Sequence, residues 1–512
     1  MNYFNLLIAS IIFTFSGKAF ERPNVLFISV DDWNDWIGAY GDNQAKTPNI
    51  DKLAAGGVSF INAHTSAVYC APSRTSLMTG LNLHSLGTYR DQPHFAPQNH
   101  PELKDLPIWF RENGYHTAGG GKLYHHMPGF IDMRGWHKYF HWSKHGIAKG
   151  WHLDSWGGDA PLPKEIPASP IAKYLYEKDK ARNPDKKLKK LNSHMEWGKL
   201  PNNQEEQMAD TICTNWAAKF IANYKGEKPF FLGFGLYAPH KPNFVPAKYY
   251  QMNPLSDIEQ PKMEPGDLDD LPPTLQKKMI NRKNHIDNPL RQLKSGKKAV
   301  QGYLAALSYA DAMIGRVLDS LGKSSHAQNT IVVLWSDNGY HLGEKGAWAK
   351  HTLWERTSNV PYIWSGPGIT VNAKVDATVS LLDTYPTLLE LCSLPQNDKN
   401  EGQSLASVLK SPKSAIDKTV IQCADHDEFA LINRDWRYVQ TRNKEEQLYN
   451  LKVDPKEHNN LVKNNRYSEN LSKFRKQIPV KVATPGKTPR ELRLEINGQN
   501  FEWKARKMKN DN

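Results

Sequence analysis

Apolar and polar positions follow two alternating patterns along most of this chain. Continuous apolar runs predict buried strands over Asn24–Val30, Val58–Ala63, Tyr115–Gly119, Pro229–Tyr237 and Thr330–Trp335. Helical spacing of apolar residues predicts helices over 203–225 and 303–321, and capping patterns predict shorter helices that begin after Thr47 and Asp105. This alternation predicts an α/β fold in which a large, mixed but mostly parallel sheet is sandwiched by helices.

The pattern is interrupted in three places. Residues 142–200 are rich in Trp and contain the Lys-rich run 186–190, and residues 254–298 are polar, so we interpret both as insertions into a main domain of residues 20–415. Near residue 415 the pattern changes to short alternating runs over 429–432, 436–440 and 447–450. These runs predict a smaller C-terminal α+β subdomain, residues 416–512, with an antiparallel sheet.

Composition and charge narrow the class of protein. With 512 residues, 39% of them hydrophobic, the chain can bury large cores, and its four cysteines exclude a small disulfide scaffold. After the N-terminal segment the sequence has no run of 18 or more apolar residues, which excludes a multi-span membrane protein. The net charge of +13 favours an anionic partner but does not choose among nucleic acid, acidic membranes and anionic polysaccharides, and a merely soluble basic surface explains it equally well.

The first residues have the pattern of an export signal. A short apolar run, Leu6–Phe15, precedes Gly17-Lys18-Ala19, which predicts a signal peptide over residues 1–19 with cleavage after Ala19. An N-terminal anchor or a buried first strand are the alternatives. Export predicts a secreted or periplasmic protein without stable membrane insertion after cleavage. Its cysteines (Cys70, Cys213, Cys392 and Cys423) could pair there, and the sequence does not say which.

Acidic and amide side chains follow two of the predicted strands. Asp31-Asp32 ends the first, and Ser336-Asp337-Asn338-Gly339 ends the last. If the two strands are parallel neighbours, these side chains meet in one crevice at the carboxyl edge of the sheet. Their oxygens would suit Ca²⁺, or with less support Mg²⁺, although each pair alone is also typical of a cap or a turn.

A third cluster is the most specific. Cys70-Ala71-Pro72-Ser73-Arg74 opens a predicted helix that Gly80 ends, so Cys70 lies at the helix N-terminus beside unpaired amides. There Cys70 and Arg74 could meet an anion. From the residues alone, Cys70 is either a low-pKa catalytic thiol or a buried, inert one.

These motifs resemble those of a known family. C-A-P-S-R with T-S-L-M-T-G is similar to the signature of the type I, formylglycine-dependent sulfatases of the alkaline phosphatase superfamily. N-V-L-F-I-S-V-D-D, G-K-L-Y-H, A-P-H-K-P, S-D-N-G-Y-H-L-G-E and W-A-K-H resemble its other motifs. In detail, the motif sequences are most similar to those of the iduronate-2-sulfatase branch. The family resemblance extends over residues 22–370 and continues more weakly beyond them. It implies an alkaline phosphatase-like fold.

The resemblance implies a role for each matched residue. Cys70 would be converted to formylglycine (3-oxoalanine) by a formylglycine-generating or sulfatase-maturating enzyme, and a hydroxyl of the hydrated aldehyde would attack sulfur. The implied calcium ligands are Asp31, Asp32, Cys70, Asp337 and Asn338. The implied catalytic residues around Cys70 are Arg74, Lys122, His125, His240 and Lys350, of which His240 and Lys350 would act on the leaving oxygen.

Four further residues are candidates for substrate contact only because they lie beside matched residues: Lys241, His351, Trp33 and His341. The run Lys186–Lys190 is most simply a solvated face. One departure concerns the substrate, because the iduronate-2-sulfatase branch has Asp-His where this chain has Asp337-Asn338.

The sequence therefore predicts a secreted hydrolase of sulfate esters on a sulfated carbohydrate, such as ulvan or a uronate-containing glycan, and no nucleic-acid partner. Two alternatives remain: a phosphate or phosphonate ester hydrolase of the same superfamily, and a noncatalytic polyanion-binding protein in which Cys70 stays a thiol.

Overall fold

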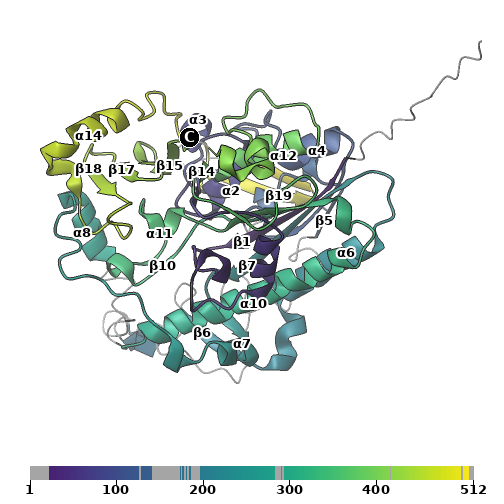
Figure 1. The fold of residues 1–512 in the computed structure, drawn as a ribbon, viewed down its shortest axis with the longest axis horizontal. Coiled ribbons are helices and arrows are strands. Elements are labelled where there is room, and N and C mark those ends of the chain that lie inside the picture. Colours follow the sequence, from purple (N-terminus) through teal and green to yellow (C-terminus); the bar gives the residue numbers. More distant parts are fainter. Residues whose placement is uncertain are drawn as a thin grey trace, which may run out of the picture.

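A central eight-stranded sheet organises the chain (Figure 1). The computed structural model describes residues 22–125, 128–140, 196–282, 290, 293–415, 417–497 and 500–506, with a few positions between 173 and 185. The strand order is β13-β2-β12-β9-β1-β7-β4-β5. The bounds are Ala373–Val375, Gly57–Phe60, Tyr362–Ser365, Thr330–Ser336, Asn24–Asp31, Phe230–Pro239, His116–Gly121 and Lys138–Phe140 in that order.

The sheet is mixed but mostly parallel, as the sequence predicts. Strands β9, β1, β7, β4 and β5 run parallel to one another, whereas β12 is antiparallel to both β9 and β2. In β1, Leu26, Ile28 and Val30 pack into one core and Val25 and Phe27 into another. This alternation, with both faces buried, explains why the strand has a continuous apolar run.

Helices cover both faces of the sheet (Figure 1). The core with Leu26 receives side chains from α1 (Pro48–Ala55), α6 (Ala209–Asn223), α7 (Ala247–Met252) and α10 (Gly296–Gly322). The core with Val25 receives side chains from α2 (Cys70–Thr79), α4 (Leu106–Glu112) and α12 (Thr384–Leu391). None of the helices in the described part of the chain is long and apolar enough to cross a membrane.

A second, antiparallel sheet lies in the C-terminal part of the chain, as predicted. Its strands are β15 (Val420–Asp425), β16 (Glu428–Ile432), β17 (Trp436–Gln440) and β18 (Glu446–Asn450), and α14 (Ser468–Arg475) packs against it. A final hairpin, β19 (Leu492–Asn497) and β20 (Asn500–Ala505), packs its Trp503 against Gly129. The boundary between the domains stays a prediction.

Smaller elements complete the described chain. They include β3 (Ala63–His64), α3 (Leu83–Leu86), the 3-10 turn η3 (Met133–Gly135), β6 (Trp197–Leu200), β8 (Asn243–Pro246), α8 (Pro273–Arg282), β10 (His341–Leu342), β11 (Trp348–Ala349), α11 (Glu355–Ser358), β14 (Val379–Ser380) and α13 (Ala406–Lys410).

Several local expectations change in the structure. The apolar run 58–63 is divided by a turn into β2 and β3. Thr47 precedes α1 but does not cap it, because its hydroxyl bonds Gly38 and Asp51 instead, whereas Asp105 caps α4 through the backbone N–H of Ile108. The signal peptide, the Lys186–Lys190 run and most of the 142–200 insertion lie outside the described residues.

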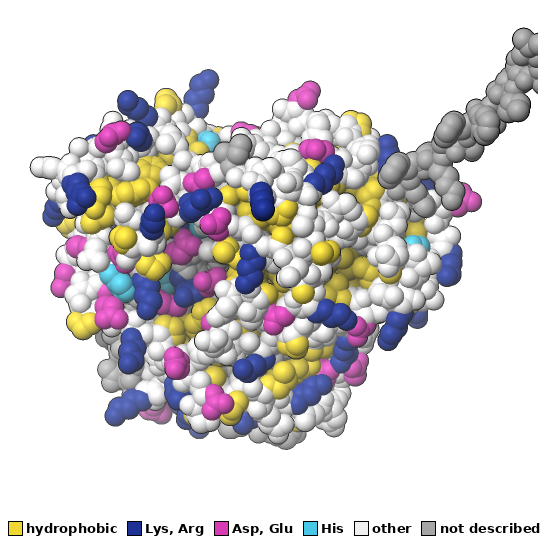
Figure 2. All heavy atoms as spheres, in the orientation of Figure 1, with side chains coloured by type: hydrophobic (Ala, Val, Ile, Leu, Met, Phe, Trp, Pro, Cys, Tyr) yellow, Lys and Arg dark blue, Asp and Glu magenta, His cyan; other side chains and the backbone are white. Residues whose placement is uncertain are grey.

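Two properties of the surface and the thiols bear on function. All four cysteines are buried and free. On the face that Figure 2 shows, Lys and Arg side chains are interspersed with Asp and Glu rather than gathered into one basic patch. The positive net charge is therefore not concentrated on this face.

Candidate active site

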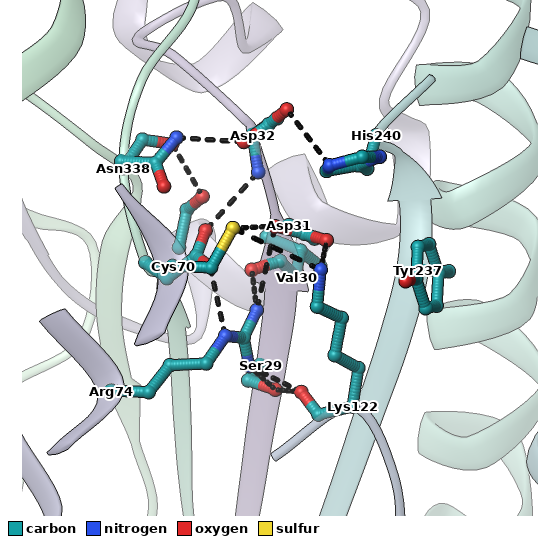
Figure 3. A network of polar contacts seen from close by, with 12 residues as sticks. Ser29, Val30, Asp31, Asp32, Cys70, Arg74, Lys122, Tyr237, His240 and Asn338 are labelled. Atoms are coloured by element: carbon teal, nitrogen blue, oxygen red, sulfur yellow. Dashed lines mark hydrogen bonds and ion pairs between the residues drawn. The ribbon is translucent and has the colours of Figure 1, made fainter. Parts of the chain in front are cut away.

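The candidate residues meet where four neighbouring parallel strands end. The carboxyl ends of β9, β1, β7 and β4 are adjacent in the sheet, and the loop after each one carries polar side chains. These are Asp337 and Asn338 after β9, Asp31 and Asp32 at the end of β1, His240 after β7, and Lys122 after β4. The predicted meeting of the two acidic clusters is thus observed (Figure 3).

The acidic cluster is held by hydrogen bonds between its own members. The backbone N–H of Asp32 donates to Asp337 Oδ1 (3.1 Å), and Asn338 Nδ2 donates to Asp32 Oδ1 (2.7 Å). Asp32 adopts a left-handed backbone conformation (φ 62°), and the Tyr303 hydroxyl donates to its carbonyl at 2.7 Å. The turn after β1 is therefore fixed from both sides.

One oxygen of this cluster is available to bind a cation. Asn338 Oδ1 is buried and has no hydrogen-bond partner among the described residues. Ligand atoms of Asp31, Asp32, Cys70 and His240 lie within 4.8 Å of one another. The carboxylates of Asp31, Asp32 and Asp337 and this amide oxygen are donors that Ca²⁺ or Mg²⁺ prefers. The residues present therefore fit a hard divalent ion.

Cys70 lies at the centre of the cluster as the first residue of α2. Its Sγ is 3.4 Å from Asp31 Oδ1, 2.8 Å from Lys350 Nζ and 3.9 Å from Lys122 Nζ. Gly80 ends α2 with a positive φ of 73°, as predicted. Burial, reinforced by Asp31, raises the pKa of the Cys70 thiol, so the interpretation as a low-pKa catalytic thiol is not supported.

Three cations balance the three carboxylates. Arg74 Nε donates to Asp337 Oδ2 at 2.8 Å, and its other nitrogens reach Ser29 Oγ (3.2 Å), the Val30 carbonyl (3.2 Å) and the Lys122 carbonyl. Lys122 pairs with Asp31, and Lys350 pairs with Asp32. A bound divalent ion would therefore leave the centre positive, which suits an anionic substrate.

Burial and pairing move the pKa values within the cluster in different directions. Burial alone would raise the pKa of Asp32, but Lys350 and His240 outweigh it and lower that pKa. Burial raises the pKa of Asp337 because Arg74 offsets only part of the desolvation. Burial would lower the pKa of Lys350, but Asp32 raises it well above the ordinary value, so Lys350 is charged.

His240 is held in one tautomer. Its Nδ1 lies 2.6 Å from the Lys241 carbonyl, and because a carbonyl only accepts, Nδ1 carries the hydrogen. Nε2 then faces the centre, 3.7 Å from Asp32 Oδ2. Burial lowers the pKa of His240 well below its usual value, so the ring is neutral.

The structure separates the remaining candidates. His125 lies three residues after Lys122 and packs its ring edge-to-face on Phe130 at 4.9 Å, so its contact with residue 70 stays a prediction. His351 is exposed, lies 4.9 Å from the Tyr69 ring and borders a cavity of about 220 Å³, and its contact with a substrate stays a prediction.

The other three candidates for substrate contact are buried in the structure: Trp33, His341 and Lys241. Trp33 is 0% exposed, and its indole N–H donates to the Trp36 carbonyl at 3.0 Å, so its ring packs in the core and its contact with a substrate stays a prediction. His341 is also buried, with Nε2 2.8 Å from Thr352 Oγ1. The Lys241 ammonium is covered by the rings of Tyr340 and Trp348 at 5.3 and 5.4 Å.

Sequence reasoning missed three residues that shape the centre. Ser29 Oγ donates to the Lys122 carbonyl at 2.7 Å, the Tyr237 ring lies 4.2 Å from Lys122 Nζ, and Tyr303 holds the Asp32 turn. Ser29 carries the one available signal, since it is the polar position inside the apolar run of β1.

Comparison with known proteins decides the family. The family model "Sulfatase" matches residues 23–394, and the model "N-sulphoglucosamine sulphohydrolase, C-terminal" matches residues 343–483. This chain belongs to the sulfatase family. The sulfatase is 35% identical to a "Sulfatase" of Formosa agariphila over 91% of this chain and 88% of the relative. It is 30% identical to human "Iduronate 2-sulfatase" over 70% of this chain and 62% of the relative.

Solved structures share the fold of this sulfatase. A structure described as in complex with its substrate D-glucosamine-2-N,6-O-disulfate aligns with a TM-score of 0.65 at 20% identity, covering 90% of this chain and 97% of the other. A phosphonate monoester hydrolase from Silicibacter pomeroyi aligns with a TM-score of 0.70 at 18% identity, covering 95% of this chain and all of the other. The fold is thus that of the alkaline phosphatase-like superfamily, and the enzyme is a sulfuric ester hydrolase.

Proposed function

We propose that this sulfatase hydrolyses sulfate esters on a sulfated carbohydrate, with residue 70 as a formylglycine nucleophile and a calcium ion beside it. The observation that carries the proposal is the position of Cys70 Sγ, 3.4 Å from Asp31 and 2.8 Å from Lys350, within an oxygen-rich cluster. A nucleophile placed there would meet a cation on one side and a proton donor on the other.

Asp31, Asp32, Asp337 and Asn338 would hold the ion. Support comes from the buried Asn338 Oδ1 without a hydrogen-bond partner in the described chain, and from a donor set made mainly of carboxylate oxygens. When bound, the ion would supply positive charge that draws a sulfate oxygen and favours a deprotonated hydroxyl on hydrated residue 70. Arg74 bonds Asp337 at 2.8 Å and contacts Asp31 at 3.8 Å, and it would keep both carboxylates oriented toward the ion.

The cations facing residue 70 would bind and protonate the substrate. Lys122 and Lys350 are within 4 Å of Cys70 Sγ and would bind sulfate oxygens, and Lys350 would stabilise the leaving oxygen. His240 presents its unprotonated Nε2 to the same space and would accept and hold a proton there. His125, on the Lys122 loop, would take the proton that allows sulfate to leave residue 70.

A carbohydrate is the substrate class that relatives and surroundings favour. One structural neighbour is described as bound to a sulfated glucosamine, another as in complex with a neocarrahexaose, and a curated relative is an iduronate 2-sulfatase. The cavity beside His351 is bordered by Lys278 and Arg442, which would pair with acidic sugars. Ulvan-type or uronate-containing glycans therefore come first among the sugars to test.

Export and maturation complete the proposal. We infer that residues 1–19 direct the chain to the periplasm or outside the cell, and that a formylglycine-generating or sulfatase-maturating enzyme oxidises Cys70 on the way. Sequencing the N-terminus of protein from its native host tests the first step, since a mature chain that begins with Met1 would contradict it.

The decisive experiment measures free sulfate released from a panel of sulfated oligosaccharides and identifies each desulfated product. The Cys70→Ala variant should lose release at least about 10³-fold, because the nucleophile is removed. Cys392→Ala, which changes an equally buried free thiol outside the centre, should retain it. Equal release by wild type and Cys70→Ala would overturn the proposal.

A phosphonate ester hydrolase is the second candidate, because a solved structure with that activity shares the fold at a TM-score of 0.70. Parallel rates on an aryl sulfate, an aryl phosphate and an aryl phosphonate separate the two, and we expect the sulfate to be fastest. For a noncatalytic polyanion-binding protein, mass spectrometry of the peptide around residue 70 would find an intact thiol instead of the aldehyde.

A further inference from the structure

A second group of ligating side chains lies outside the candidate active site and is independent of the proposed function. It consists of His94, Asp105 and Asp132, whose ligand atoms lie within 4.8 Å of one another. All three residues are at most 2% exposed. They come from the loop before α4, from the N-terminus of α4 and from the residue before η3, so three segments distant in sequence converge here.

The two carboxylates are not equally neutralised. Arg134 pairs with Asp132 through Nη2 at 2.6 Å and Nε at 2.9 Å. Among the described residues, Asp105 accepts only from neutral groups, the Tyr124 hydroxyl at 2.6 Å and the backbone N–H of Ile108 at 3.2 Å. A buried second carboxylate without a cation of its own is costly, so either a proton or a metal ion is expected between them.

His94 is the observation that favours a metal ion. Its Nε2 is buried and has no hydrogen-bond partner in the described chain. It lies 3.8 Å from Asp132 Oδ2, which is too long for a hydrogen bond. A metal ion with bonds of about 2.0–2.2 Å to nitrogen and oxygen spans up to about 4.2 Å between two ligands, so this separation fits one ion shared by both atoms.

We propose that His94, Asp105 and Asp132 form a structural binding site for a borderline divalent cation such as Zn²⁺. One imidazole and two carboxylates make a mixed N and O donor set, which differs from the oxygen-dominated set beside Cys70. Three ligands of one such ion lie at most about 3.8 Å from one another, so closure by about 1 Å would bring all three ligand atoms into range. Water would complete the coordination.

The site would brace the loop that carries Lys122. Tyr124 lies two residues after Lys122, and its hydroxyl is bonded to Asp105 at 2.6 Å. An ion on Asp105 would therefore fix the start of α4, the start of η3 and this loop together. His94, Asp105 and Asp132 act through the loop and are positioning residues rather than catalytic ones.

The test measures Zn²⁺ binding by competition with a chromophoric chelator, in saturating Ca²⁺, for wild type, His94→Gln and His240→Gln. We expect wild type and His240→Gln to bind one Zn²⁺ ion with the same affinity. The affinity of His94→Gln for this ion should be lower by about tenfold or more. The same ion should raise the thermal midpoint of wild type but not of His94→Gln. Equal binding by wild type and His94→Gln, or no Zn²⁺ bound by wild type, would overturn the site.

A measurement on wild type alone covers the case in which His94→Gln does not fold. X-ray absorption at the zinc edge should show one imidazole with oxygen ligands and no sulfur. A sulfur ligand would place the ion at Cys70 instead and contradict the proposal. Because sulfate release is not the readout, failure of this site is distinguishable from failure of the proposed sulfatase mechanism.

Discussion

Arg74 is one of the three cations that balance the buried acidic centre, and it pairs with Asp337. Its guanidinium is fully buried and bonds Asp337, Ser29 and the carbonyl of Val30. Such a group contributes less to net stability than its contacts suggest, but removing one partner leaves a charge buried without compensation. The position should therefore be intolerant even to a substitution of similar size.

We expect Arg74→Gln to lower the free energy of unfolding by about 3–5 kcal/mol in metal-free buffer, because Asp337 loses the cation with which it forms an ion pair. Urea denaturation measures the loss. Arg442→Gln is the matched control, since Arg442 is 53% exposed and pairs loosely with Asp425 at 3.4 Å. Arg442→Gln should lower the free energy of unfolding by less than about 1 kcal/mol. Equal losses in the two variants would show that Arg74 does not balance the buried carboxylates.

His64 gives the molecule an acid-sensitive point away from the active centre. The side chain is fully buried at the end of β3, with Nδ1 2.9 Å from Ser358 Oγ and Nε2 2.7 Å from Asn62 Oδ1. Burial lowers the pKa of His64 to about 4. Because the folded pKa lies below the unfolded value, the contribution to stability is complete above about pH 6.5 and is lost as the pH falls through 4.

This loss should amount to about 3 kcal/mol between pH 6.5 and 4. Denaturation of wild type and His64→Gln at pH 7, 6, 5 and 4 measures it, since the difference between the two proteins isolates this residue from the other titrating groups. His458→Gln, at a half-buried surface position, is the control. A constant difference across the series would mean that His64 titrates normally in the folded protein.

At the scale of elements, the close approach of β7 to the Lys122 loop decides where that lysine lies. A Cβ on Gly235 would lie 2.3 Å from the Lys122 carbonyl carbon and 2.4 Å from its oxygen, both backbone atoms. The Lys122 carbonyl is in turn bonded by Ser29 and Arg74. Only glycine at this position of the strand allows the loop to reach its observed place.

We expect Gly235→Ala to reduce sulfate release by at least about tenfold, because the added methyl displaces backbone and moves Lys122 away from residue 70. Gly233→Ala is a matched control on the same face of β7, where the new methyl would meet the Leu123 side chain at 2.4 Å. Both variants should lose about 1–3 kcal/mol of stability by overpacking. Activity retained in Gly235→Ala would show that the loop does not need this approach.

At the scale of the whole molecule, the sequence predicted the sheet and its acidic edge because neighbouring parallel strands bring their ends together. It could not predict contacts made by loops, since their spacing carries no period. Trp33 lies beside Asp32 in sequence, yet the turn directs its ring into the core. His94 and Asp132 have no motif, and only the folded chain brings them to Asp105.

A buried cation, Arg437, is among the contacts that join the C-terminal sheet to the catalytic domain. Arg437, on β17, is 0% exposed and donates to the Leu353 carbonyl at 2.8 Å and to Ser358 Oγ at 2.8 Å. It also pairs with Glu355 and, at 2.7 Å, with Glu457. The segment it bonds begins three residues after Lys350, so the sheet supports one wall of the active centre.

Arg437→Met should therefore weaken two distant regions together. We expect faster hydrogen exchange both in β15–β18 and in residues 351–358, with a loss of about 3–5 kcal/mol because Glu355 and Glu457 lose their shared cation. The rate of sulfate release should fall, because the segment that follows Lys350 is no longer held by Arg437. Arg434→Met, which changes an exposed arginine 3.5 Å from Asp376, is the control and should leave both regions protected. Faster exchange confined to the sheet would mean that Arg437 stabilises its own sheet without coupling it to the catalytic centre.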